Sequence, residues 1–179
     1  MFDIDSSFYI LYGIIQNTGI LKNNENCLIK LTHENVFKWC QHYFNNNNIN
    51  YTIISELSLL FNYSNLSVVK KHLLFWIHSI DINVHSIFHP ILFQLTKDEF
   101  NNLLLGWIYS RLDYTLTDRE RNKRYFFLFF NSLNNYEDLT TLLKLYDICF
   151  YILPDENNKQ NTQHIYIKVN TDQLVLLKS

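Results

Sequence analysis

The chain has 179 residues, of which 47% are hydrophobic and 18% are charged, and its formal net charge is −2 at pH 7. This length and balance indicate one globular domain with a substantial core, and the near-neutral charge argues against a large basic nucleic-acid footprint. The apolar runs are strand-sized and stay below the roughly 20 residues of a membrane span, so we expect a soluble or peripheral protein.

The first half of the chain is predicted to alternate helices with pairs of strands. An apolar run after Asp5 and Ser6 predicts the first helix, and Thr32 is predicted to cap a second helix with Glu34 in its first turn. Strand-like runs follow each helix, and a further helix closes the half. The ranges are Cys27–Leu31, Tyr51–Ile54 and Leu57–Phe61 for strands and Leu66–His78 for the closing helix.

The second half is predicted to repeat this order. Thr96 and Glu99 form a capping box that opens the third helix, and Asn134 or Asn135 opens the fourth. The predicted strands are Tyr125–Phe130, Ile148–Leu153 and Ile165–Val169, and a short helix is predicted over Thr171–Leu177. Each half therefore has the order helix, strand, strand, helix, strand, strand.

Two similar stretches of nine residues, Leu11–Gly19 and Leu104–Leu112, lie 93 positions apart. Each is an apolar helical run with a glycine at its third position, Gly13 or Gly106. Glycine lets two helices approach closely, so we expect these two residues to lie at the interface between the repeats. The repeat predicts a single domain of two halves. Its parts are a first half of residues 1–80, a linker of about residues 81–95 and a second half of residues 96–179.

The first stretch is similar to the nine-residue motif that names the LAGLIDADG homing endonucleases, since it keeps both glycines and the apolar spacing. The second stretch has Leu112 where the motif ends in glycine. The segment from Leu95 to Trp107 also resembles the lead-in to the second motif helix in such proteins. The resemblance implies an α+β fold of two αββαββ(α) halves related by a pseudo-two-fold axis, with central paired helices and an antiparallel sheet saddle.

The resemblance implies the fold without the nuclease activity. In that family the eighth motif position is a carboxylate that binds the catalytic divalent metal, whereas this chain has Thr18 and Arg111 there. A two-metal site needs carboxylates at the ends of both helices, and Asp113 would supply one ligand at most. His85 and His89 precede a proline without further ligands nearby, and we interpret them as ordinary polar residues. We therefore predict no enzyme activity, no catalytic or metal-binding residue, no cofactor and no small-molecule substrate.

Nucleic-acid binding is the other property that the resemblance implies, on the sheet face turned away from the helices. Phosphate neutralisation needs cations there. The candidates are Lys22, Lys30, Arg119, Arg121, Lys123, Arg124 and Lys168. Asp118 and Glu120 offset part of the positive charge of the arginine cluster. A solvated hairpin tip explains this cluster equally well. Because Tyr125–Phe130 is apolar on both faces, we also expect burial against another protein.

The residue choice indicates the compartment. The chain has no alanine and an excess of residues with AT-rich codons, so we infer an AT-rich genome. Three cysteines without CxxC spacing indicate a reducing compartment, and we expect Cys149 to be a buried structural residue in its apolar run. Without a presequence signal, we predict a mitochondrial, organelle-encoded protein. The alternative is the cytoplasm of an AT-rich organism or its virus.

These observations lead to one functional prediction and its rivals. We predict a non-catalytic structural component of a large ribonucleoprotein, namely a mitochondrial ribosomal protein derived from a LAGLIDADG endonuclease. Its partners would be other protein subunits, with RNA as a further candidate. The alternatives are an intron maturase-like RNA- or DNA-binding protein, a protein-interaction subunit of another organellar complex and, third, an active nuclease.

Overall fold

The computed structural model describes residues 7–23, 25–63, 90–110, 115–118, 123–131, 136–154 and 163–170. The first half contains α1 (Ser7–Thr18), β1 (Ile20–Leu21), β2 (Asn26–Lys30), α2 (Glu34–Asn46), β3 (Tyr51–Ser55) and β4 (Ser58–Asn62). A 3₁₀ helix, η1 (Pro90–Gln94), precedes the second half. That half contains α4 (Lys97–Ser110), β5 (Thr115–Asp118), β6 (Lys123–Asn131), α5 (Tyr136–Leu145), β7 (Phe150–Pro154) and β8 (Gln163–Asn170).

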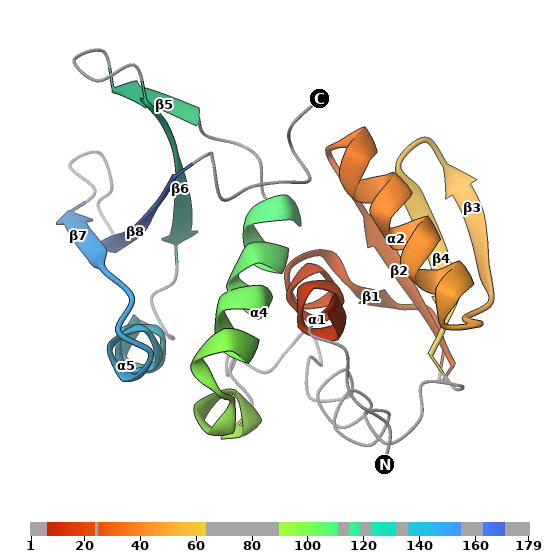
Figure 1. Ribbon diagram of the computed structural model, residues 1–179, viewed down its shortest axis with the longest axis horizontal. Helices are drawn as coiled ribbons and strands as arrows, with labels where there is room; N and C mark the ends of the chain where they lie inside the picture. Colours follow the sequence, from red (N-terminus) through yellow and green to blue (C-terminus); the bar gives the residue numbers. More distant parts are fainter. Residues whose placement is uncertain are drawn as a thin grey trace.

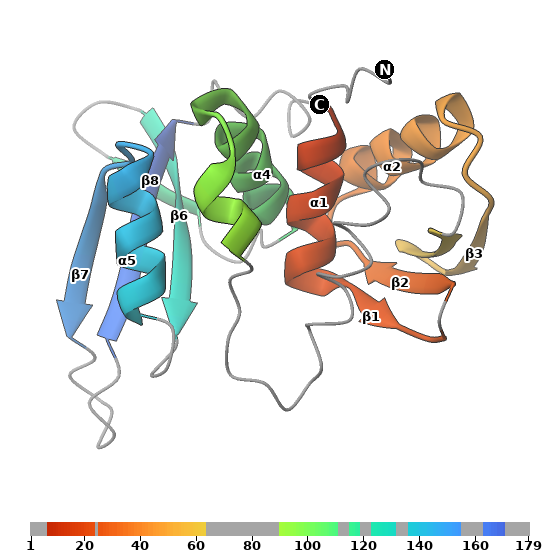
Figure 2. The same cartoon turned by 90° about the horizontal axis from the view of Figure 1, so that it is seen from below.

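The strands form two antiparallel sheets of four strands each, ordered β1-β2-β4-β3 and β5-β6-β8-β7. Both halves thus share one element order and one strand order. The two sheets lie on either side of a central pair of helices, α1 and α4, as Figures 1 and 2 show. The predicted α+β class, the order αββαββ and the central helix pair are confirmed.

The backbones of α1 and α4 touch where two glycines meet. A Cβ atom built on Gly13 would overlap the carbonyl oxygen of Leu103, and one built on Gly106 would overlap that of Ile10. The same Cβ on Gly106 would lie 3.0 Å from the Cα of Gly13. Because these neighbours are backbone atoms, no side chain at either position can rotate out of the way. The helix crossing therefore requires glycine in both halves.

The start of α4 is fixed by the predicted capping box. The backbone N–H of Thr96 donates to Glu99 Oε2 at 2.7 Å, and the N–H of Glu99 donates to Thr96 Oγ1 at 3.3 Å. The other carboxylate oxygen of Glu99 accepts a hydrogen bond from the hydroxyl of Tyr9 at 3.0 Å. The cap of one central helix is thereby bonded to the other helix.

The predicted cap of α2 is wrong by one residue. The N-cap is His33, whose Nδ1 accepts a hydrogen bond from the backbone N–H of Asn35 at 3.2 Å, so Thr32 precedes the cap. An imidazole nitrogen can accept at the same position as the usual hydroxyl or carboxylate oxygen. The first-turn position of Glu34 is as predicted.

Stacked aromatic pairs lie in the core of both halves. In the first half, Phe44 of α2 stacks on Phe61 of β4 with ring centroids 4.8 Å apart. Near the start of the second half, Phe100 of α4 stacks on Tyr146, which follows α5, at 4.1 Å. All four side chains belong to one continuous core. The core therefore joins both halves.

The last residues of the predicted linker pack into the core. Residues 90–94 form η1, and Leu92 is fully buried. The hydroxyl of Tyr146 donates to the carbonyl oxygens of Leu92 and Leu95, at 3.0 Å in the second case. The apolar residues of this segment are thus held by both burial and hydrogen bonding. The predicted helices over Leu66–His78 and Thr171–Leu177 lie outside the described residues.

The strand predictions are confirmed to within a few residues, and the differences have local causes. The strand predicted from Leu57 begins at Ser58, because Leu57 has a φ of 59° and forms the turn that joins β3 to β4. The strand predicted from Ile148 begins at Phe150, because the chain first leaves α5 through Asp147, whose φ is 58°. Left-handed residues of this kind interrupt regular pairing.

Candidate nucleic-acid interface

The end of α1 corresponds to the position of the catalytic acid in the sequence motif. Thr18 is the last residue of the helix, and its hydroxyl donates to the carbonyl oxygen of Ile14 at 3.2 Å. The next residue, Gly19, donates its N–H to the carbonyl of Ile15 at 2.6 Å. Thr18 is neutral and its hydrogen is directed back into its own helix. The first helix end therefore offers no anionic ligand to a divalent cation.

The end of α4 has the same kind of hydroxyl contact. Ser110 donates to the carbonyl oxygens of Gly106 and Trp107, at 2.8 and 3.0 Å. Arg111 and Asp113 lie outside the described residues, so their placement stays a prediction. Within the described ranges, no group of three or more His, Cys, Asp or Glu side chains is placed to hold a metal ion.

The outer face of the first sheet follows from the strand register. Paired residues point to the same face, and successive residues along a strand alternate between faces. Four residues of β2 and β4 point to the helices and lie in the core: Cys27, Ile29, Leu59 and Phe61. Asn26, Leu28 and Lys30 therefore point outward. Lys22 also belongs to this face, because its N–H donates to the carbonyl of Asn26 at 3.0 Å and so continues the pairing of β1 with β2.

Two exposed lysines bracket this outer face. Lys22 and Lys30 are both exposed, and the rows in which they lie are four residues apart along β2, or about 13 Å. Between them runs an apolar row in which Ile20 and Leu60 are paired with Leu28. Ile20 is 41% exposed, whereas Leu28 is only 7% exposed although it lies outside the core cluster. The face therefore combines cations at its margins with an apolar centre.

A turn of asparagines holds Lys22 in place. Asn23 Oδ1 accepts hydrogen bonds from the N–H groups of Glu25 and Asn26, at 2.9 and 2.8 Å, and from the Asn26 side chain at 3.0 Å. The hydroxyl of Tyr63 donates to the carbonyl of Asn23 at 3.1 Å. This role of Asn23 was not predicted from the sequence, although Asn is a common residue of such turns.

The predicted cations of the second half are placed only in part. Arg119 and Arg121 lie outside the described residues. The backbone of Lys123 pairs with Asp118 at the β5–β6 hairpin, and that of Lys168 pairs with Phe127 on β6. Arg124 pairs with Thr117 in the same hairpin. Of the predicted basic residues, the structure brings Lys22 and Lys30 onto one face, and a nucleic-acid contact by any of these residues stays a prediction.

The cysteines divide into two classes. Cys27 and Cys40 are buried, and burial raises the pKa of both thiols, that of Cys27 to about 12. Both are therefore inert thiols. The prediction of a buried Cys149 is wrong, because this residue is exposed. It lies in the connection between α5 and β7 rather than inside a strand, so its apolar neighbours in sequence do not surround it.

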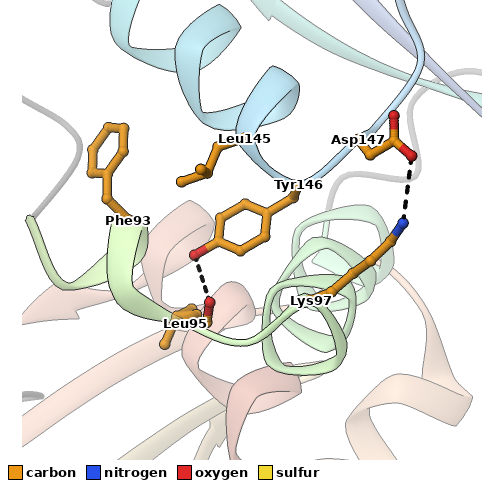
Figure 3. Close-up of a pocket in the computed structure, with 6 residues that line it drawn as sticks. All are labelled: Phe93, Leu95, Lys97, Leu145, Tyr146 and Asp147. Atoms are coloured by element: carbon orange, nitrogen blue, oxygen red, sulfur yellow. Dashed lines mark hydrogen bonds and ion pairs between the residues drawn. The ribbon is translucent and has the colours of Figure 1, made fainter.

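A pocket of about 310 Å³ lies at the start of α4, the end of that helix opposite Ser110 (Figure 3). Its lining is Phe93, Leu95, Lys97, Leu145, Tyr146 and Asp147. The polar groups in it bind one another: Tyr146 donates to Leu95, and Lys97 pairs with Asp147 at 3.7 Å. None of these residues belongs to the first sheet, so the pocket is separate from the outer face that carries Lys22 and Lys30.

Two αββαββ halves around a glycine-crossed helix pair define a LAGLIDADG-like fold. No family model matches the sequence, and no curated protein matches it at a significant level. None of the described helices is long and apolar enough to cross a membrane.

Solved structures agree on the fold. The N-terminal LAGLIDADG domain of DUF199/WhiA aligns with a TM-score of 0.53 and 17% identity, over 96% of this chain and 80% of that one. Full-length DUF199/WhiA from Thermotoga maritima gives 0.52 and 16%, over 99% of this chain and 55% of that one. This chain thus spans about half of the full-length protein. A doubly substituted variant of I-DmoI, in complex with its nicked target DNA in the presence of manganese, gives 0.50 and 11%, over 96% of this chain and 92% of that one.

Proposed function

We propose that this chain is a non-catalytic LAGLIDADG-fold protein that serves as a structural component of a large assembly containing nucleic acid. The observation that carries the proposal is Thr18, a neutral residue that stands at the metal-ligand position and donates its hydroxyl hydrogen to its own helix. A phosphodiester cleavage site of the two-metal kind cannot be built without an oxygen anion at each helix end.

The outer face of the first sheet supports the assembly part of the proposal. Lys22 and Lys30 can each contact a phosphate group, whereas the row of Ile20, Leu28 and Leu60 between them suits an apolar protein surface. A face used for free duplex binding would carry more cations. The I-DmoI variant, which has the same fold, was crystallised with its target DNA, so this fold is compatible with a nucleic-acid partner.

Within this proposal, an organellar ribosome is the first assembly to test, and mitochondrial synthesis fits the codon bias of the chain. A ribosome offers both RNA and protein surfaces to a small subunit. An intron maturase-like binding protein is the second candidate, favoured by the two exposed lysines. A subunit of a protein-only organellar complex is the third, favoured by the apolar row.

Binding and cleavage can be measured on the purified chain. We expect structured RNA or duplex DNA to bind with a salt-dependent affinity, and Lys22→Glu with Lys30→Glu to weaken it. Lys144→Glu is the control for each of the two changes made singly, since Lys144 is exposed on α5 in the helix layer and the charge change per substitution is the same. The proposal also expects no cleavage with magnesium or manganese. Metal-dependent cleavage would overturn the non-catalytic assignment. Unchanged binding in the double variant would show that Lys22 and Lys30 do not contact the nucleic acid.

A further inference from the structure

The strand β3 forms the outer edge of the first sheet. It pairs with β4 on one side, and Figures 1 and 2 place it at the rim of the molecule, at the opposite end from β7. Thr52, Ile53 and Ile54 are exposed, with Ile53 at 54%. Two exposed isoleucines in succession are unusual for a sheet edge that only water contacts.

The direction of the β3 backbone groups follows from one hydrogen bond. The N–H of Asn62 donates to the carbonyl of Asn50 at 2.8 Å, in register with the pairing of Thr52 and Leu60. Hydrogen-bonded and non-hydrogen-bonded pairs alternate in antiparallel strands, so Thr52 directs its N–H and C=O toward β4. Tyr51 and Ile53 then direct their N–H and C=O groups away from the sheet. These groups are a template for another strand.

The edge of β3 lacks the usual protection against strand pairing. It contains no charged residue and no proline, and its bulge begins only after Ile53. The equivalent edge of the second sheet, β7, ends in Pro154, which has no N–H to donate. A strand that can pair along Tyr51–Ile53 therefore has a regular template on β3.

We propose that β3 pairs antiparallel with β3 of a second copy of this chain, about a two-fold axis at Thr52. Tyr51 of each copy then lies opposite Ile53 of the other, and their outward N–H and C=O groups form four hydrogen bonds between the copies. Each such pair joins an aromatic to a β-branched side chain, and Thr52 meets its own copy on the outer face. Both are favourable cross-strand pairs.

The charges near β3 favour this occupant. Identical strands without charge bring no like-charge repulsion to their pairing, and antiparallel pairing places the nearest acid, Glu56, at opposite ends of the joined strands. The contact is isologous, so it closes at two copies and joins the two four-stranded sheets into one of eight strands. An interface of two five-residue strands is smaller than the roughly 1,600 Å² of a stable complex, so the dimer is expected to be reversible.

Sedimentation equilibrium over a hundredfold range of protein concentration tests the dimer in the absence of nucleic acid. Failure of the dimer proposal can therefore be distinguished from failure of the proposed function. We expect the chain to approach a dimer and to stop there. Ile53→Pro removes an outward N–H that β4 does not use, and Thr52→Lys places two cations opposite each other. Each should weaken dimerisation by about tenfold or more. Tyr151→Lys, at the equivalent exposed position of β7, is the matched control and should leave the dimer unchanged.

Cysteine cross-linking tests the register even if a variant folds poorly. In a Cys149→Ser background, which removes the exposed native thiol, Thr52→Cys should form a disulfide dimer on oxidation. Residues on the axis lie about 4.5 Å apart at their Cα atoms, within the disulfide range. Ser55→Cys, in the same strand and also exposed, should not, since its copies would be about 20 Å apart.

Three results would overturn the proposal. The first is a monomer at every concentration. The second is association that continues beyond two copies and is lost in Tyr151→Lys, which would indicate pairing of β3 with β7. The third is cross-linking at Ser55→Cys as fast as at Thr52→Cys, which would exclude the antiparallel register centred on Thr52.

Discussion

The two halves of the molecule share one fold and differ in how the end of the second helix of each half contacts the rest of the chain. The second helix of each half finishes in the same way, with a left-handed residue, Asn48 or Asp147, and an N–H from the next residue to the carbonyl five positions back. The residue before it differs: Asn47 is exposed and caps its own helix, whereas Tyr146 is buried and bonds to η1. Shared backbone geometry thus sets the fold, and single side chains set how each half connects to the rest.

The largest effect is expected from substitutions that break the contact between α1 and α4, on which both halves depend. Gly13→Ala and Gly106→Ala each place a methyl group against the backbone of the other central helix, so the helices must move apart. We expect either change to lower the free energy of unfolding by about 2 to 4 kcal/mol, measured by urea denaturation. The double variant should cost less than the sum, because one separation relieves both overlaps.

Asn45→Ala, at an exposed position of α2, is the control for the glycine changes and should stay within about 0.5 kcal/mol of the parent. If Gly106→Ala were equally neutral, the backbone contact between α1 and α4 would not exist in solution as described.

A smaller difference in stability is expected between substitutions at the end of α5 and at the end of α2. Tyr146→Phe leaves the carbonyl groups of Leu92 and Leu95 without their buried donor, and we expect a loss of about 1 to 3 kcal/mol. Asn47→Ala, at the equivalent position of the first half, removes only an exposed cap and should cost about 0.5 to 1 kcal/mol. Chemical denaturation measures both, and equal losses would contradict the distinction between the two ends.

The Tyr9 hydrogen bond predicts a dependence on alkaline pH. Burial, with the hydrogen bond and charge of Glu99, raises the pKa of Tyr9 to about 12 from its ordinary value near 10. Because folding favours the neutral phenol, its contribution is fully present below pH 10 and is lost as the pH rises through 12. Tyr9→Phe should therefore lose less stability than the parent between pH 8 and pH 11 in urea titrations. Identical losses would show that folding does not raise the pKa of Tyr9.

The smallest effect compares the two left-handed residues. Glycine adopts this conformation without strain, so Asn48→Gly and Asp147→Gly should each stabilise the fold by about 0.5 kcal/mol. Asp147→Gly should gain more, since it also removes a negative charge from the C-terminal end of α5, where the helix dipole disfavours it. Its ion pair with Lys97, at 3.7 Å between exposed groups, offsets little of this. Thermal unfolding of both variants provides the comparison, and the reverse order would assign the larger weight to the ion pair.

Features that depend on local pattern were predictable from the sequence. The glycine motif predicted the helix pair, and the capping box of Thr96 and Glu99 predicted the start of α4 to the residue. Alternation of strand-like and helical runs predicted the order of both halves. The capping box and the strand-like and helical runs are signals within a few residues of chain, whereas the helix pair was implied by the repeat of the glycine motif and by its resemblance to a known family.

The rest depends on contacts between distant residues. The hydrogen bond of Leu92 was not predictable because its partner, Tyr146, lies 54 positions away. The exposure of Cys149 depends on where β7 begins, which the left-handed turn at Asp147 decides. The outer face between Lys22 and Lys30 depends on strand register, which periodicity alone does not fix.

The most direct test of the central claim is sedimentation of the native protein from gently lysed source cells, with and without RNase, followed by identification of whatever sediments with it. A non-catalytic component of a ribonucleoprotein should travel with a large particle, and RNase should dismantle that particle. Migration as a small free species under both conditions would contradict the account.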